Sequence, residues 1–221
     1  MGLILNIETA STNCSVALAK DGKTIALKED NDKSYSHSER LHVYIDEVLK
    51  QSKIKLKDLD AIAVSKGPGS YTGLRIGVSA AKGLCYSLNI PLISVLTLQS
   101  LAHQVNPDSG YIVPMLDARR KEVYSAVFDF NHNLIRNTEA QVLDDHSFKD
   151  LLINHSVIFI GSGVEKTKEL IRHQNAIFIE DKLPSANEMN ELSFKKYKMG
   201  EIEDIAYFEP YYLKDFVATK P

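Results

Sequence analysis

The sequence predicts an α/β protein made of two similar lobes, each a mixed sheet with helices. Three strand patterns open the chain, and helix and strand patterns then alternate in the order βββαβαβα. The same order appears again after Asn106-Pro107-Asp108-Ser109-Gly110, a cluster of turn-forming residues that suits a lobe boundary. A repeated unit of this kind is typical of two ribonuclease-H-like lobes. We therefore expect an N-terminal lobe at 1–105 and a smaller, degenerate C-terminal lobe at 106–221.

Hydrophobic periodicity assigns the elements of the first lobe. Strands are expected at 3–9, at 14–30 as a hairpin, at 59–65 and at 91–96. Asp21-Gly22 favours the hairpin turn. Helices are expected from Ser36, the N-cap, to about 53, then at 72–88 and at 97–105. The first helix places one apolar face at ~100° per residue, formed by Leu41, Tyr44, Ile45 and Val48.

The second lobe repeats this arrangement with weaker patterns. Strands are expected at 111–118, 122–130, 134–143, 157–163 and 176–180, and helices at 147–153, 164–173 and 185–200. Asp117-Ala118-Arg119 ends the first of these strands. We interpret Asp117 as a salt-bridged residue at a strand end, and a small polar site is the alternative.

The composition is that of an ordinary globular protein, with 44% hydrophobic and 25% charged residues. No apolar run reaches the ~18 residues of a membrane helix, so we expect no membrane association and a cytoplasmic protein. Two cysteines without metal-ligand spacing predict neither a disulfide framework nor a zinc site. The net charge of −3 argues against a free-standing nucleic-acid binder. Two short basic clusters, Arg119-Arg120-Lys121 and Lys195-Lys196-Tyr197-Lys198, are interpreted as solvated faces, although either can contact phosphate.

The glycine-rich stretch SKGPGSYTGLRIGVSAAKGL, residues 65–84, carries neither common phosphate-binding code. Its spacing fits neither the P-loop nor the dinucleotide fingerprint, because Thr72 stands where the last glycine of each is required. Glycine costs a helix up to about 1 kcal/mol relative to alanine, so we expect a close neighbour along a stripe of small residues. The stripe comprises Gly73, Gly77, Ala80, Ala81 and Leu84. That neighbour is either the lobe's own sheet and first helix or the helices of another chain.

Several segments together resemble the TsaB (YeaZ) family. They are LILNIETASTNCSVAL, HSERL, KGPGSYTGLRIGVSAAKGL, PLISVLTLQSLA and DARRKEVYSAVF. The resemblance covers roughly the first 130 residues closely, and beyond them only Pro210 to Leu213 match the family's usual ending.

The resemblance implies the actin-like ATPase superfamily and a role in placing threonylcarbamoyl on the adenosine beside the tRNA anticodon. It implies a non-catalytic subunit that dimerises with the catalytic subunit TsaD through its first two helices and is joined by the ATPase TsaE. The expected partner-binding residues are then those of the apolar face and the small-residue stripe: Leu41, Tyr44, Ile45, Val48, Gly73, Gly77, Ala80, Ala81 and Leu84. ATP and metal are then expected in the partner subunits and not on this chain alone. Contact with tRNA is expected only through the complex, and a homodimer is expected when the chain is isolated.

The metal-binding pattern of TsaD-type subunits is missing from the first helix. Their HxxxH places two imidazoles one turn apart, whereas here Leu41 follows His37 by four residues. His42 lies about 140° around the helix from His37. We therefore expect no metal site and a surface position for His37. The metalloprotease motif HExxH is also absent from the sequence.

Two other functions remain as alternatives. Glu8, Thr9 and Ser11 lie where an actin-like ATPase binds Mg²⁺ and phosphate, so a stand-alone ATPase or kinase using Glu8 and the interlobe cleft is one. The same residues also suit a polar turn. The other is an RNA-binding module using Lys195 to Lys198, which the acidic net charge disfavours.

Overall fold

The computed structural model describes residues 1–31 and 37–214 of the 221-residue chain. These residues form two compact units. The first unit combines Met1–Ser100 with Pro184–Tyr211, and the second combines Leu101–Leu183 with residues 212–214. The expected N-cap Ser36 lies outside the described residues.

The first unit contains a five-stranded mixed sheet in the order β3-β2-β1-β4-β5. Its strands are β1 (Leu3–Glu8), β2 (Asn13–Lys20), β3 (Lys23–Asn31), β4 (Ala61–Ser65) and β5 (Leu92–Val95). The first three strands are antiparallel neighbours, as expected for a hairpin at Asp21-Gly22, where both residues have positive φ. β4 and β5 run parallel to β1, because helical connections return the chain to the same end of the sheet.

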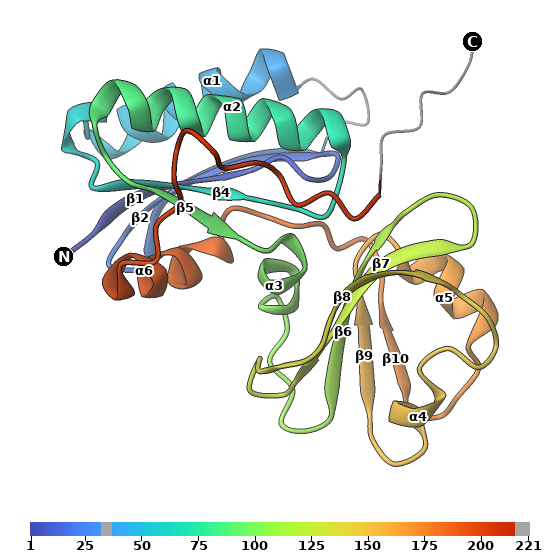
Figure 1. The fold of residues 1–221 in the computed structure, drawn as a ribbon. Coiled ribbons are helices and arrows are strands. Elements are labelled where there is room, and N and C mark those ends of the chain that lie inside the picture. Colours follow the sequence, from blue (N-terminus) through green and yellow to red (C-terminus); the bar gives the residue numbers. More distant parts are fainter. Residues whose placement is uncertain (32–36, 215–221) are drawn as a thin grey trace, which may run out of the picture. The chain divides into compact units, whose positions relative to one another are not determined.

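Helices cover both faces of this sheet (Figure 1). One face carries α1 (His37–Ser52) and α2 (Tyr71–Leu88), and α6 (Met189–Met199) packs on the other. Side chains of β1 alternate between the two faces. Leu5 and Ile7 join the cluster with α1 and α2, whereas Ile4 joins the cluster with α6.

The second unit contains another five-stranded sheet, in the equivalent order β10-β9-β6-β7-β8. Its elements are β6 (Tyr111–Asp117), β7 (Glu122–Asp129), β8 (Leu134–Val142), α4 (Lys149–Leu152), β9 (Val157–Ile160), α5 (Val164–Leu170) and β10 (Ala176–Ile179). Two short helices complete the chain path, η1 (Leu56–Asp58) before β4 and α3 (Thr97–Ala102) after β5. Along the chain the strands and helices follow the predicted order, and each unit contains a mixed five-stranded sheet with helices, which confirms the fold class.

The division of the chain differs from the predicted boundary at 105. The chain leaves the first unit at Ser100 and returns to it at Pro184. Residues 184–211 pack with the first unit because α6 fills one face of its sheet. Asn6 Nδ2 donates to Asn190 Oδ1 at 2.8 Å, and Glu203 N donates to Leu92 O at the sheet edge at 2.8 Å.

Candidate protein-binding groove

Part of the small-residue stripe predicted from the sequence lies on the inner face of α2 and packs against its own unit. Gly73, Gly77 and Ala81 are buried. A Cβ added to Gly73 would lie 2.1 Å from the Thr9 carbonyl oxygen, and one added to Gly77 would lie 2.3 Å from Thr9 Oγ1. The prediction that these three residues face a foreign helix is therefore wrong, because the turn after β1 lies against Gly73 and Gly77, and Ala81 belongs to the core cluster of the first unit.

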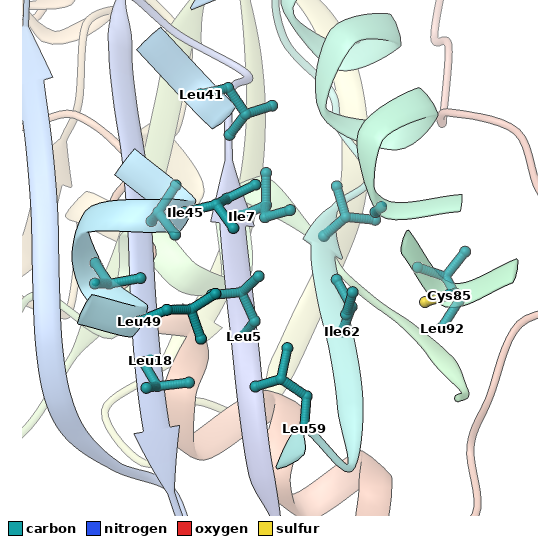
Figure 2. Close-up of a cluster of buried hydrophobic side chains, with 14 of the residues drawn as sticks. Leu5, Ile7, Leu18, Leu41, Ile45, Leu49, Leu59, Ile62, Cys85 and Leu92 are labelled. Carbon is teal, nitrogen blue, oxygen red and sulfur yellow. The ribbon is translucent and has the colours of Figure 1, made fainter. Parts of the chain in front are cut away.

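The apolar face of α1 is enclosed in the same way. Leu41, Ile45 and Val48 are 0%, 5% and 0% exposed and belong to the core cluster of the first unit. Figure 2 shows Leu41 and Ile45 among buried side chains that include Ile7 of β1. The prediction that these three residues contact a partner is wrong, because they pack against their own sheet. Tyr44 is half-buried beside this cluster.

An open groove lies instead on the outer side of α1 and α2. Its volume is about 600 Å³. The residues that line it, which we call the α1–α2 groove, are Ser38, His42, Arg75, Ile76, Ser79, Ala80, Gly83 and Leu84. Two of the residues predicted to bind a partner, Ala80 and Leu84, therefore lie in this groove. The other lining residues were missed.

Small side chains leave room in the middle of the groove. A Cβ added to Gly83 would have no heavy atom of the described residues within 4 Å. Ile76, Ser79, Ala80, Gly83 and Leu84 follow the i, i+3, i+4, i+7, i+8 spacing of one helix face. The sequence also contains this second row of small residues, but periodicity alone does not distinguish it from the row at Gly73, Gly77 and Ala81.

The groove is lined by apolar and weakly polar residues together with two basic ones. Among the residues that the structure describes, no carboxylate lines it, and the basic ones that do are His42 and Arg75. The Arg75 guanidinium carbon lies 4.0 Å from the centre of the Tyr71 ring. Two large apolar side chains on the same helices are exposed, Tyr86 at 82% and Val43 at 51%. The arrangement suits a closely approaching helix, since small residues let backbones come together.

His37 lies inside the first unit and not on its surface. The residue is 2% exposed, and its Nε2 lies 2.8 Å from the Ser11 carbonyl oxygen. The expected surface position was wrong, because the ring covers the polar turn after β1. Within residues 1–31 and 37–214, no three His, Cys, Asp or Glu side chains gather as metal ligands.

Glu8 and Thr9 are enclosed as well, since both are 0% exposed. Glu8 Oε1 accepts hydrogen bonds from Ala10 N at 2.6 Å and from Ser65 Oγ at 2.8 Å. Its Oε2 is buried and has no hydrogen-bond partner among the described residues. Ser11, which is half-buried, accepts from Asn13 N at 3.2 Å. A nucleotide has no access to Glu8 or Thr9 in this structure, and the prediction that they bind one is corrected accordingly.

Glu8 is expected to make the stability of the chain depend on pH. Burial raises the pKa of its carboxyl from 4.5 to about 7, against hydrogen bonds from Ala10, Ser65 and Thr9 that lower it. Below pH 4.5 the group is protonated in the folded and unfolded chain alike and contributes nothing. As pH rises toward 7 the unfolded chain ionises first, so stability falls, and above about 7 the loss is constant.

Glu8→Gln is expected to remove this pH dependence, because the amide keeps an acceptor oxygen but does not ionise. A shift of this size corresponds to roughly 3 kcal/mol. The measurement is the free energy of unfolding in urea, compared between parent and variant from pH 4.5 to 8. Parallel curves for the two proteins would show that Glu8 ionises normally in the folded chain.

Comparisons with known proteins agree with this fold. The family model of TsaD, tRNA N6-adenosine threonylcarbamoyltransferase, matches residues 31–221. The tRNA threonylcarbamoyladenosine biosynthesis protein TsaB of Escherichia coli (strain K12) is 30% identical over 225 residues, which cover 98% of this chain and 96% of that protein. TsaB of Bacillus subtilis (strain 168) is 33% identical over 180 residues, covering 76% of this chain and 74% of that protein.

A solved structure gives the same result for the fold alone. A Pseudomonas aeruginosa protein described as similar to peptidase YEAZ has a TM-score of 0.84 and 23% identity, covering 97% of this chain and all of that chain. Over the described residues, every helix is too short or too polar to span a bilayer. The matches in sequence, with which the fold of the solved structure agrees, confirm the predicted family: the chain belongs to the TsaB (YeaZ) family of tRNA threonylcarbamoyladenosine biosynthesis proteins.

Proposed function

We propose that this chain is a non-catalytic subunit of the bacterial tRNA threonylcarbamoyladenosine complex, and that its α1–α2 groove binds a TsaD-like catalytic subunit. The observation that carries the proposal is the open row of small residues on the outer face of α2, centred on Gly83. The family's role in tRNA modification supports the choice of partner.

Gly83 is a costly residue at an exposed position in a helix. A mid-helix glycine costs up to about 1 kcal/mol relative to alanine, and Gly83 gains no close packing against the described residues in return. A partner helix that approaches this position would offset the cost. It would also cover the exposed Tyr86 and Val43 side chains, and buried apolar area stabilises a complex by roughly 25 cal/mol per Å² before association costs.

Catalysis is assigned to the partner because this chain's candidate groups are closed. Leu41 of α1 occupies the place of the second ligand of an HxxxH pair, and its side chain is buried in the core of the first unit. Glu8 and Thr9 have no exposed surface. We propose that ATP and metal bind in the partner subunits, that a TsaE-like ATPase joins the pair, and that the whole acts on tRNA in the cytoplasm.

A second copy of this chain is proposed to occupy the same groove when the partner is missing. Exposed apolar helix faces tend to be covered in solution. The homodimer and the complex with the catalytic subunit then exclude one another, because both use the α1–α2 groove.

The proposal is tested by reconstitution. The chain is co-expressed with a TsaD-like subunit, and complex formation is measured by sedimentation. Modification of a tRNA transcript is then measured with threonylcarbamoyl-adenylate supplied, for each subunit alone and for both together. We expect a complex and a product that requires both subunits. Turnover of this substrate, or hydrolysis of ATP, by the purified chain alone would overturn the assignment.

A further inference from the structure

The turn between β6 and β7 in the second unit carries a compact positive charge. Arg119, Arg120 and Lys121 follow one another there, and all three side chains are exposed. Figure 1 shows β6 and β7, the strands that this turn joins, as neighbours in the sheet. None of the three forms a salt bridge with a carboxylate of the described residues.

The acidic residues beside the turn are neutralised by lysines from other segments. Lys166 Nζ lies 2.7 Å from Asp117 Oδ1, which confirms that Asp117 is a salt-bridged strand end. Glu122 forms an ion pair with Lys214. Each of these two carboxylates is paired with a lysine, so neither of them offsets the charge of the three basic residues in the part of the chain that the structure describes.

The same contacts fix the shape of the turn. Lys166 Nζ also donates to the carbonyl oxygens of Arg120 at 2.8 Å and Glu122 at 3.1 Å, and its side chain is only 20% exposed. Arg119 N donates to Asp117 Oδ1 at 2.6 Å, and Arg119 O accepts from Glu122 N at 3.1 Å. Lys166 thus binds three acceptors on one hairpin, and these contacts restrain the backbone of the basic turn.

Arginine is an unusual residue for this backbone. Arg119 and Arg120 have φ values of 69° and 51°, in the left-handed region that glycine and asparagine adopt more easily. The turn therefore carries two guanidinium groups at positions where its conformation favours other residues. The backbone geometry does not explain why arginine stands at positions 119 and 120. The charge and the planar shape of the guanidinium group can explain it.

We propose that this turn, residues 118–121, binds the phosphodiester backbone of a folded RNA. Guanidinium groups bind phosphate oxygens through paired hydrogen bonds, and a rigid turn loses little entropy on binding. A membrane fits less well, because binding to anionic lipid requires clusters of about four to eight basic residues. The net charge of −3 makes such a contact weak for the chain alone. The inference rests on the proposed function, which supplies tRNA as the RNA that the assembled complex meets.

The test measures binding of an unmodified tRNA transcript to the complex of the full chain with its catalytic subunit. Fluorescence anisotropy gives the affinity from 50 to 200 mM salt. The variant is Arg119→Asn with Arg120→Asn, because asparagine keeps the left-handed backbone and removes the charge. The control is Lys195→Asn with Lys198→Asn, which removes the same charge from two exposed positions on α6.

Removing two phosphate contacts is expected to make the slope of log affinity against log salt about two units less negative. Over this salt range the parent complex then loses about tenfold more affinity than the Arg119/Arg120 variant, and the control double variant behaves like the parent.

A variant that forms the complex normally and binds tRNA with the parental slope overturns the inference and leaves the proposed function intact. Equal losses in variant and control, or loss of binding to phosphatidylserine vesicles with tRNA binding unchanged, overturn it as well. Failure of the parent chain to form the complex counts against the proposed function itself and removes the basis of the inference with it.

Discussion

Gly73→Ala is expected to destabilise the first unit strongly, by about 3 kcal/mol, the upper range of overpacking effects in cores. The new Cβ would lie 2.1 Å from the Thr9 carbonyl oxygen, which is backbone and cannot rotate away. The higher helix propensity of alanine returns at most about 1 kcal/mol. Chemical denaturation followed by circular dichroism measures the change in the free energy of unfolding.

Gly83→Ala is the matched control for this substitution, since it changes the same residue type within the same helix. Within the part of the chain that the structure describes, a Cβ at Gly83 has no heavy atom within 4 Å, so this variant is expected to gain up to about 1 kcal/mol of stability. If both variants were equally stable, α2 would not pack against the Thr9 turn through Gly73, and the assignment of its inner face would be wrong.

Gly83→Trp is expected to keep the fold and to lose about 100-fold in affinity for the catalytic subunit. The indole would fill the middle of the α1–α2 groove, and a clash of roughly 3 kcal/mol at the centre of an interface corresponds to that loss. Titration calorimetry with the purified TsaD-like subunit measures the affinity, and thermal denaturation reports the fold.

Lys198→Trp serves as the control for Gly83→Trp, because Lys198 is exposed on α6, on the opposite face of the sheet from α2. It adds the same aromatic surface outside the groove and is expected to bind the catalytic subunit as the parent does. Parental affinity in the Gly83→Trp variant would show that the partner binds elsewhere.

The order of elements was predictable because it depends on local patterns. The hairpin at Asp21-Gly22 and the alternation of strands and helices are set by turn residues and periodicity. The return of residues 184–211 to the first unit was not predictable in this way. It depends on α6 meeting the sheet and on Glu203 pairing with Leu92, contacts between segments far apart in the sequence.

Of the residues predicted on α2, Gly73, Gly77 and Ala81 lie on its inner face, whereas Ala80 and Leu84 line the α1–α2 groove. α2 carries two rows of small residues, one through Gly73 and Gly77 and another through Ala80 and Gly83. Periodicity identifies both rows and cannot rank them, because the deciding neighbour, Thr9, comes from another element. His37 was misplaced for the same reason, since its partner is the Ser11 carbonyl oxygen of the turn after β1.

Thiol labelling of Ser79→Cys tests most directly whether the catalytic subunit binds in the α1–α2 groove. Both native cysteines are buried, and burial raises the pKa of the Cys14 thiol to about 11 and of the Cys85 thiol to about 12, so they react slowly. Ser79 is exposed in the α1–α2 groove, and cysteine closely matches serine in size. In the dilute isolated chain of the Ser79→Cys variant, the thiol at position 79 is expected to react with a maleimide as fast as a fully exposed thiol. Lys198→Cys on α6 provides a reference thiol.

Excess TsaD-like subunit is predicted to slow labelling at position 79 by at least about tenfold while the reference thiol at position 198 reacts unchanged, since a thiol buried in an interface is inaccessible. Unchanged labelling at position 79 in a complex that sedimentation shows to be fully formed would contradict the claim that the outer face of α1 and α2 is where the catalytic subunit binds.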